Sequence, residues 1–289
     1  MKIHIFLIPC LFWAFVSLAQ DDFPVDNSLM GEESTIVDKV FPAIQLFNFP
    51  TTAILPKGEM KLTFAHRMGV LSTGTSGSFG LYQANSRFGA DLGLTSFITF
   101  GIGSTSQKKL YDGYVKFQLT RQSAKFPVET SIFSSISFSA LKLNYPDNRQ
   151  ASWQRMFYTS QLLVSRSISK KLSVQLTGTY LHKNMVESTN DKNDIFSIGG
   201  AVSMKLTRML YIAAEYVFLP KNQVASLEVQ QHIGSLGIQI HTGPRHVFQI
   251  FLSNSVGILP GTVISETQQK FKPKSLRISF NIPTTFKLY

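Results

Sequence analysis

The stretch Leu172-Ser-Val-Gln-Leu-Thr-Gly-Thr-Tyr180 decides the fold, because apolar and polar residues alternate along it. Leu172, Val174, Leu176 and Tyr180 fall on one face of a strand, and serine, glutamine and threonine fall on the other. A period of two indicates a strand whose two faces meet different surroundings. Since the pattern recurs along most of the chain, it predicts an all-β protein, an antiparallel transmembrane β-barrel with apolar side chains outward and polar ones inward.

About twelve segments carry this pattern, and each is close to the 9–11 residues that a tilted strand needs to cross a bilayer. They are predicted at residues 59–69, 85–93, 97–104, 111–120, 128–139, 152–165, 172–181, 195–205, 209–219, 232–241, 246–254 and 275–285.

The connections between these segments alternate in length. Short ones lie at residues 94–96, 167–171, 206–208 and 242–245, and longer ones at 70–84, 140–151, 182–194, 220–231 and 255–274. Short turns on the periplasmic side and longer loops outside are typical of outer-membrane barrels. A soluble β-sandwich or a periplasmic barrel remains the alternative at this point, because the apolar face would then be a core rather than a lipid surface.

The N-terminus predicts a signal peptide over residues 1–19, cleaved after Ala19 and followed by Gln20. It has a basic start, an apolar run over residues 5–18 and small residues at the cleavage site. A membrane anchor is the alternative, but the run is short for the roughly 20 residues that a spanning helix needs. Cys10, the only cysteine, lies in this run, so the mature chain is expected to have no disulfide or thiol chemistry. No later segment is apolar for long enough to form a spanning helix.

Charge divides the remaining chain into an acidic, flexible segment at residues 20–45 and a basic barrel domain at 46–289. After Lys2, Lys39 and the six acidic residues of the segment are set aside, 26 of the 28 basic and 11 of the 17 acidic residues remain, a net charge of +15. In a secreted barrel this balance favours a lipid bilayer, lipopolysaccharide phosphates or a small anionic solute as partners rather than nucleic acid. The segment could instead bind a periplasmic protein. Its acidic residues are Asp21, Asp22, Asp26, Glu32, Glu33 and Asp38.

The lumen is the best candidate site, because eight charged residues fall on the inward register. Charges inside a membrane barrel persist only in water or in pairs. Two hypotheses follow: the charges pair and close the lumen, or the excess of cations lines a narrow path for anions. The eight are Lys61, Arg67, Arg87, Asp91, Lys116, Arg155, Glu215 and Arg277.

Catalytic and metal sites have little support in the sequence. His66 falls on the lipid-facing register and is the one candidate for an interfacial catalytic base. No Gly-x-Ser-x-Gly motif is present, and the histidines lack the spacing of metal ligands. No catalytic residue, metal or cofactor is therefore predicted.

Several short motifs resemble a known family. They include Asn48-Phe-Pro-Thr-Thr52, Phe64-Ala-His-Arg-Met-Gly69, Tyr111-Asp-Gly-Tyr-Val-Lys116 and His241-Thr-Gly-Pro-Arg-His-Val-Phe-Gln249. As a set spanning residues 45–285 they resemble the DUF5777 barrels of Bacteroidota. The resemblance implies an outer-membrane location and a Bacteroidota source, and it carries no activity with it. The motif positions singled out are His66, Asp112, Gly113, His246, Gln249 and Asn254.

These observations together predict a non-enzymatic outer-membrane barrel, a narrow channel or binding barrel for small anionic solutes. One alternative is a structural or assembly barrel with periplasmic partners. The other is an outer-membrane lipid-modifying enzyme that uses His66.

Overall fold

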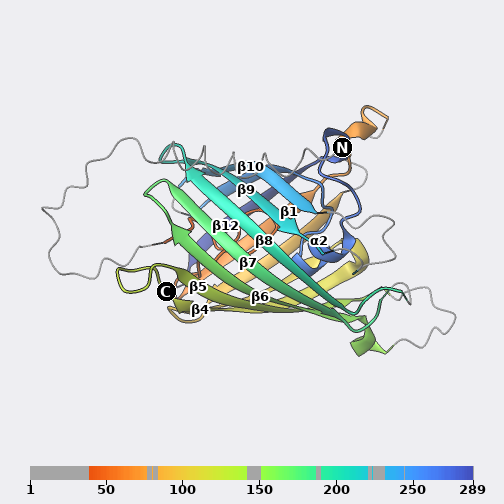
Figure 1. Ribbon diagram of the computed structural model, residues 1–289, viewed down its shortest axis with the longest axis horizontal. Helices are drawn as coiled ribbons and strands as arrows, with labels where there is room; N and C mark the ends of the chain where they lie inside the picture. The colour runs from red at the N-terminus through yellow and green to blue at the C-terminus, as the bar shows by residue number, and fades with distance from the viewer. Residues whose placement is uncertain are drawn as a thin grey trace, which may run out of the picture.

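The computed structural model describes residues 39–76, 80, 84–141, 151–186, 190–220, 223, 232–243 and 245–288. The predicted signal peptide and most of the acidic segment lie outside these residues. Within them the chain forms a closed antiparallel barrel of twelve strands (Figure 1), in which each strand pairs with its sequence neighbours and β1 pairs with β12. The closed ring confirms the predicted fold and excludes the sandwich. The strands are β1 (Glu59–Arg67), β2 (Asn85–Gly93), β3 (Ile98–Thr105), β4 (Leu110–Thr120), β5 (Glu129–Ser139), β6 (Met156–Ser167), β7 (Leu172–Lys183), β8 (Asp194–Lys205), β9 (Leu210–Phe218), β10 (Ile233–His241), β11 (Val247–Ser253) and β12 (Arg277–Lys287).

The alternation predicted from the sequence is present in the exposure of the side chains. On β7, Leu176 is 59% exposed while its neighbour Thr177 is 7% exposed. Aromatic and aliphatic side chains on every strand face outward in the same way, among them Phe88 and Ile198. An apolar outer wall around a closed ring leaves no unpaired strand edge, which is the condition for crossing a bilayer with strands.

The two ends of the barrel differ in their connections. At the short-turn end, residues 94–97, 121–128, 168–171, 206–209, 242–243 and 245–246 lie between the strands, and both β1 begins and β12 ends there. At the loop end lie residues 68–76, 106–109, 151–155, 184–186, 190–193, 219–220 and 254–276. Figure 1 shows the short helix α2 (Pro260–Glu266) at the end opposite the marked C-terminus.

Most strand boundaries lie within two residues of the prediction, and the largest difference, at the start of β6, has an identifiable reason. The segment expected to begin at residue 152 starts with a 3₁₀ turn, Ser152–Arg155, and the strand itself begins at Met156. Proline also interrupts a ladder: β11 and β12 pair from Gln249↔Asn281 toward the loop end, and beyond Pro283 only the bridge His246↔Thr284 remains. Pro283 has no N–H to donate, so the ladder loses a bond at this position.

The lumen is occupied by the chain's own N-terminal residues. The backbone N–H of Thr51 donates to the Ile44 carbonyl (3.1 Å) and that of Leu46 donates to the Phe49 carbonyl (3.1 Å), so residues 44–51 form a hairpin. We call residues 39–58, which contain this turn, the lumen hairpin. Its two arms run to the short-turn end, where Ser173 Oγ donates to the Val40 carbonyl and Leu55 N–H donates to Thr99 Oγ1. Residues 40–45, the last of the segment predicted at 20–45, lie inside the barrel and continue directly into 46–58.

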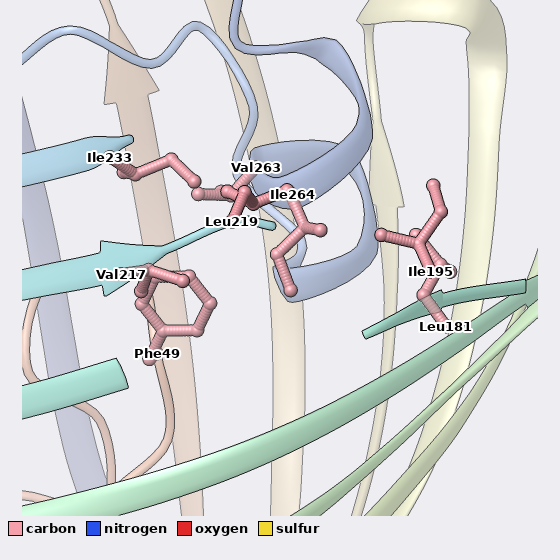
Figure 2. Packing of buried hydrophobic residues seen from close by; sticks show 8 residues of the cluster. All are labelled: Phe49, Leu181, Ile195, Val217, Leu219, Ile233, Val263 and Ile264. Atoms are coloured by element: carbon pink, nitrogen blue, oxygen red, sulfur yellow. The ribbon is translucent and has the colours of Figure 1, made fainter. Parts of the chain in front are cut away.

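Helix α2 closes the lumen from the other end. The connection between β11 and β12 folds inward, and Val263 and Ile264 of α2 pack against Phe49 at the tip of the lumen hairpin (Figure 2). Lys108 Nζ lies 3.1 Å from Glu266 Oε1 and ties α2 to the turn between β3 and β4. The wall residues that complete this apolar cluster are Leu181, Ile195, Val217, Leu219 and Ile233. The hairpin tip and the helix thus belong to one apolar cluster toward the loop end of the barrel.

Candidate functional site in the lumen

Glu215 holds the tip of the lumen hairpin. Its Oε1 accepts hydrogen bonds from the backbone N–H groups of Phe47 (3.0 Å) and Phe49 (3.2 Å), and Oε2 accepts one from Asn48 (3.0 Å). The side chain is inward on β9, where Glu215 pairs with Ser235 of β10. A buried carboxylate is stable only when it is hydrogen-bonded or paired, and three successive N–H donors meet that need.

Arg67 holds the same turn from another part of the wall. Its guanidinium donates to Asn281 Oδ1 (2.8 Å), to the Phe47 carbonyl (3.2 Å) and to Asn48 Oδ1 (3.3 Å). It also lies 4.7 Å from the ring centroid of Phe251, on which the Phe47 ring stacks at 4.5 Å. Arg67 is fully buried. The hairpin tip is therefore fixed by one anion and one cation of the wall.

Lys116 and Gln175 bind the arms of the hairpin. The Lys116 ammonium donates to the carbonyls of Ile44 and Thr51, both at 3.0 Å. Gln175 accepts from the Thr52 N–H at 3.1 Å and donates to the Pro50 carbonyl at 3.0 Å. These wall side chains bind backbone groups of the hairpin. Every extended chain has such groups, so these contacts do not depend on the hairpin's side chains.

The remaining charges on the inward faces of β1, β2 and β4 pair with one another. Lys61 Nζ lies 2.9 Å from Asp91 Oδ2. Arg87 donates to both carboxylate oxygens of Asp112, at 3.0 and 2.5 Å. Tyr114 Oη donates to Asp91 at 2.7 Å and gives this carboxylate a second partner.

Two glycines of β3 make room for this network. A Cβ on Gly101 would meet the Tyr114 ring, and one on Gly103 would meet the Arg87 guanidinium. Both large side chains therefore lie flat over the backbone of β3 instead of crossing the lumen. That orientation leaves space between the wall and the lumen hairpin.

Two cavities occupy this space. The vestibule opens at the short-turn end and has a volume of about 790 Å³, counting space open to solvent. The chamber, of about 630 Å³ on the same basis, lies deeper, below the start of α2. Ile44, Gln45 and Thr63 line both, so the cavities adjoin there. The charged residues that line them are Lys39, Glu59, Lys61 and Arg245 in the vestibule and Arg87, Asp91, Asp112 and Lys116 in the chamber.

The structure separates the predicted lumen residues into three groups. Arg67, Lys116 and Glu215 hold the hairpin, while Lys61, Arg87 and Asp91 form wall pairs with Asp112. Arg155 and Arg277 lie at the loop end: Arg155 precedes β6 and donates to the Ser139 and Ala140 carbonyls, and Arg277 donates to the Met68 carbonyl.

The motif positions have structural partners of several kinds. Gln249 donates to the Gln45 carbonyl of the hairpin and accepts from Asn281. Asn254 bonds to Gly234 N–H and to the His232 and Gln269 carbonyls, so it fixes the connection that carries α2. His246 contacts Thr284 across the interrupted ladder, and Gly113 lies opposite Ile102 and Ile136.

Neutral side chains that the sequence did not single out complete the site. Gln175, Ser235 and Asn281 are buried wall residues that bind the hairpin. Their signal was present as inward register on predicted strands. The sequence does not show that a chain segment fills the lumen, however, so an inward serine or glutamine is interpreted only as a residue that faces water.

His66 has a partner on the outer wall. Its Nδ1 lies 2.8 Å from Ser86 Oγ on the neighbouring strand, and its ring stacks on Phe280 with centroids 5.0 Å apart. Within the described ranges the Nε2 atom of His66 has no hydrogen-bond partner, so the ring lacks an orienting group of the kind a catalytic triad supplies.

In the part of the chain that the structure describes, no three His, Cys, Asp or Glu residues gather as a metal site. Across those same residues, no helix has the length and apolar character needed to span a membrane.

Comparisons with known proteins agree with this architecture. The chain matches a NanC porin structure at 12% identity with a TM-score of 0.50, over 79% of this chain and 100% of that one. It matches a KdgM porin at 9% identity and a TM-score of 0.47, over 78% and 99%. A COG4313 outer membrane channel from Pseudomonas putida F1 matches at 10% identity and 0.44, over 81% and 97%. No curated protein matches by sequence. The model of the membrane-bound β-barrel domain DUF5777 matches residues 41–286, and the chain therefore belongs to the DUF5777 family.

Proposed function

We propose that the chain is a non-enzymatic outer-membrane barrel that binds small anionic solutes, or passes them through the narrow space beside the lumen hairpin. The signal predicted over residues 1–19 would direct it across the inner membrane. On this proposal the short-turn end faces the periplasm, as in other outer-membrane barrels.

The observation that carries the proposal is the charge of the two adjoining cavities. Their linings hold five cations and three carboxylates, a surplus of two positive charges. Two of the carboxylates, Asp91 and Asp112, are already paired with wall cations. A confined surplus of positive charge raises the local concentration of anions and repels cations. The porin-like fold of the NanC structure is compatible with such a path.

The test is single-channel conductance of the refolded chain 20–289 in planar bilayers, with the reversal potential measured in a tenfold KCl gradient. Small conductance steps are expected, with a reversal potential displaced toward that of chloride. The double variant Lys39→Glu/Arg245→Glu reverses both mouth cations and is expected to remove the anion preference. Arg208→Glu is the matched control, because this exposed cation lies in a turn at the same end but outside the vestibule lining. A folded barrel that is silent or prefers cations would contradict the proposal.

A second function has one specific observation behind it, the 2.8 Å contact between His66 and Ser86 on the lipid-facing wall. Acyl-ester hydrolysis with Ser86 as nucleophile and His66 as base would make this barrel a lipid-modifying enzyme. Incubation of the folded barrel with phospholipid vesicles tests it. Fatty-acid release that Ser86→Ala abolishes would favour the enzyme over the solute barrel.

A further inference from the structure

The vestibule has two chemically different walls. Its inner side is the apolar face of the lumen hairpin, with Pro42, Ile44, Ile54 and Leu55, and Pro283 adds an apolar patch from β12. Most of the rest of the lining is polar, so the vestibule combines apolar side chains with placed polar groups, as ligand pockets commonly do. A small inorganic anion would use only the charged part of this cavity.

Cations lie at the open end of the vestibule. Lys39 and Arg245 are both exposed there, while Lys61 lies deeper and is paired with Asp91. The carboxylate among the lining residues is Glu59. The mouth is therefore the place where a negative head group would meet charge without losing its hydration.

The deep end of the vestibule is where it adjoins the chamber, at Ile44, Gln45 and Thr63. Thr63 is 8% exposed, and its Oγ1 has no hydrogen-bond partner among the described residues. Gln249 and Asn281 already bond to each other and to the hairpin. Beyond the mouth the vestibule thus offers apolar hairpin side chains and little to a second charged group.

From this arrangement we infer that the vestibule binds a single-chain amphipathic anion, an alkyl chain of moderate length that ends in a carboxylate or phosphate. The head group lies at Lys39 and Arg245, and the chain lies along the hairpin face toward Thr63. The inference rests on the proposed function, since the same cavity is involved, and it adds an apolar requirement to the anionic one.

Tryptophan fluorescence can report occupancy at this site. The chain has two tryptophans, Trp13 in the predicted signal and Trp153 at the loop end. The variant His241→Trp/Trp153→Phe places the single tryptophan of chain 20–289 in the vestibule lining. Chain 20–289 with its native Trp153 serves as the control, because quenching there reports only non-specific partition into the lipid.

The probe is bromolaurate, a brominated twelve-carbon fatty acid that quenches nearby tryptophan, added to barrels in nanodiscs of fixed lipid content. Saturable quenching is expected for the vestibule reporter and a shallow linear response for the control. Laurate and dodecyl phosphate should both displace the probe, whereas dodecyltrimethylammonium and acetate should not. Adding Lys39→Gln/Arg245→Gln to the reporter should weaken binding by about tenfold.

Each contrary result has a defined meaning. Equal displacement by dodecyltrimethylammonium would remove the charge requirement, and equal displacement by acetate would remove the apolar one. Quenching that matches the Trp153 control would overturn the site altogether. If the barrel still showed an anion-selective conductance in that last case, the proposed function would stand without this ligand class. If neither saturable quenching nor anion-selective conductance were seen, both the ligand class and the proposed function would be rejected.

Discussion

Three buried charges are stabilised by backbone groups of the lumen hairpin. Glu215 receives three N–H donors, and Arg67 and Lys116 donate to hairpin carbonyls. In a membrane barrel such charges would otherwise need water or an opposite charge. The hairpin is therefore part of the electrostatic balance of the wall as well as a filling for the lumen.

Glu215→Gln is expected to loosen the hairpin tip without unfolding the barrel. The amide keeps one acceptor oxygen but directs an NH₂ group at backbone N–H donors, so a charged hydrogen bond worth about 1.5–3 kcal/mol is lost. Amide hydrogen exchange at Phe47, Asn48 and Phe49 should become faster, and the free energy of unfolding in urea should fall by a similar amount. Ser203→Ala is the control, because Ser203 is buried on the adjacent strand and its Oγ has no partner in the described part of the chain. Unchanged exchange at the tip in Glu215→Gln would show that the carboxylate does not hold it.

At the scale of elements, the lumen hairpin and α2 each fill one end of the barrel. The hairpin approaches from the short-turn end and α2 from the loop end, and they meet at Phe49, Val263 and Ile264. The vestibule lies against β1 and β10 to β12, and the chamber lies against β1, β2, β4 and β5. On the proposed function, solutes pass or bind beside a hairpin that stays in place.

A disulfide between the hairpin and the wall tests whether solutes pass beside the hairpin or only after the hairpin has left the lumen. The hydroxyls of Thr52 and Ser165 are 2.5 Å apart, and Cys10 is the only native cysteine, so Thr52→Cys/Ser165→Cys gives a single pair that oxidation can join. Conductance should be the same in the oxidised and reduced barrel, because the cavities remain beside the locked hairpin. Conductance that appears only after reduction would mean that solutes pass where the hairpin now lies.

Displacing α2, unlike locking the hairpin, is expected to change the conductance. Gly261 lies against β6, and a Cβ there would come within 2.7 Å of Thr159 Oγ1 and 2.9 Å of the Phe157 ring. Gly261→Leu should therefore push α2 out of the loop end and increase the single-channel conductance severalfold. Gly178→Leu is the matched control, since a Cβ at Gly178 has no atom within 4 Å. An unchanged conductance in Gly261→Leu would mean that α2 does not limit the path.

At the scale of the whole molecule, the sequence predicted the strands of the barrel, because their positions depend on local patterns of apolar and polar residues. Each strand was recognisable because lipid on one side and a polar lumen on the other impose the period of two seen in Leu172–Tyr180. The lumen hairpin was not predicted. Its prolines argue against a strand, it has no periodicity, and its partners, from Arg67 to Asn281, are spread over most of the chain. The position of the hairpin, which is held by distant parts of the chain, decides which inward charges bind the hairpin and which pair with each other.

The apolar outer face gives the last prediction, which separates a lipid-facing wall from a wetted one. Leu176 is 59% exposed near the middle of β7, opposite Val164 and Gly200. An arginine at the middle of a bilayer costs about 2–4 kcal/mol, whereas a surface substitution in water changes stability by about 0.5 kcal/mol at most. Leu176→Arg should therefore lower the free energy of unfolding in lipid vesicles by about 2–4 kcal/mol.

Leu206→Arg is the matched control, because Leu206 is 44% exposed in the turn at residues 206–209, where the side chain reaches the interface. Its cost should be about 0–1 kcal/mol. Urea titration followed by the fluorescence of Trp153 measures both variants on one scale. The conclusion depends on the difference between the two changes in the free energy of unfolding, because both variants introduce the same charge and remove the same side chain. Equal costs would mean that the exposed face of β7 does not lie in lipid, and the apolar wall would then have to be covered by protein.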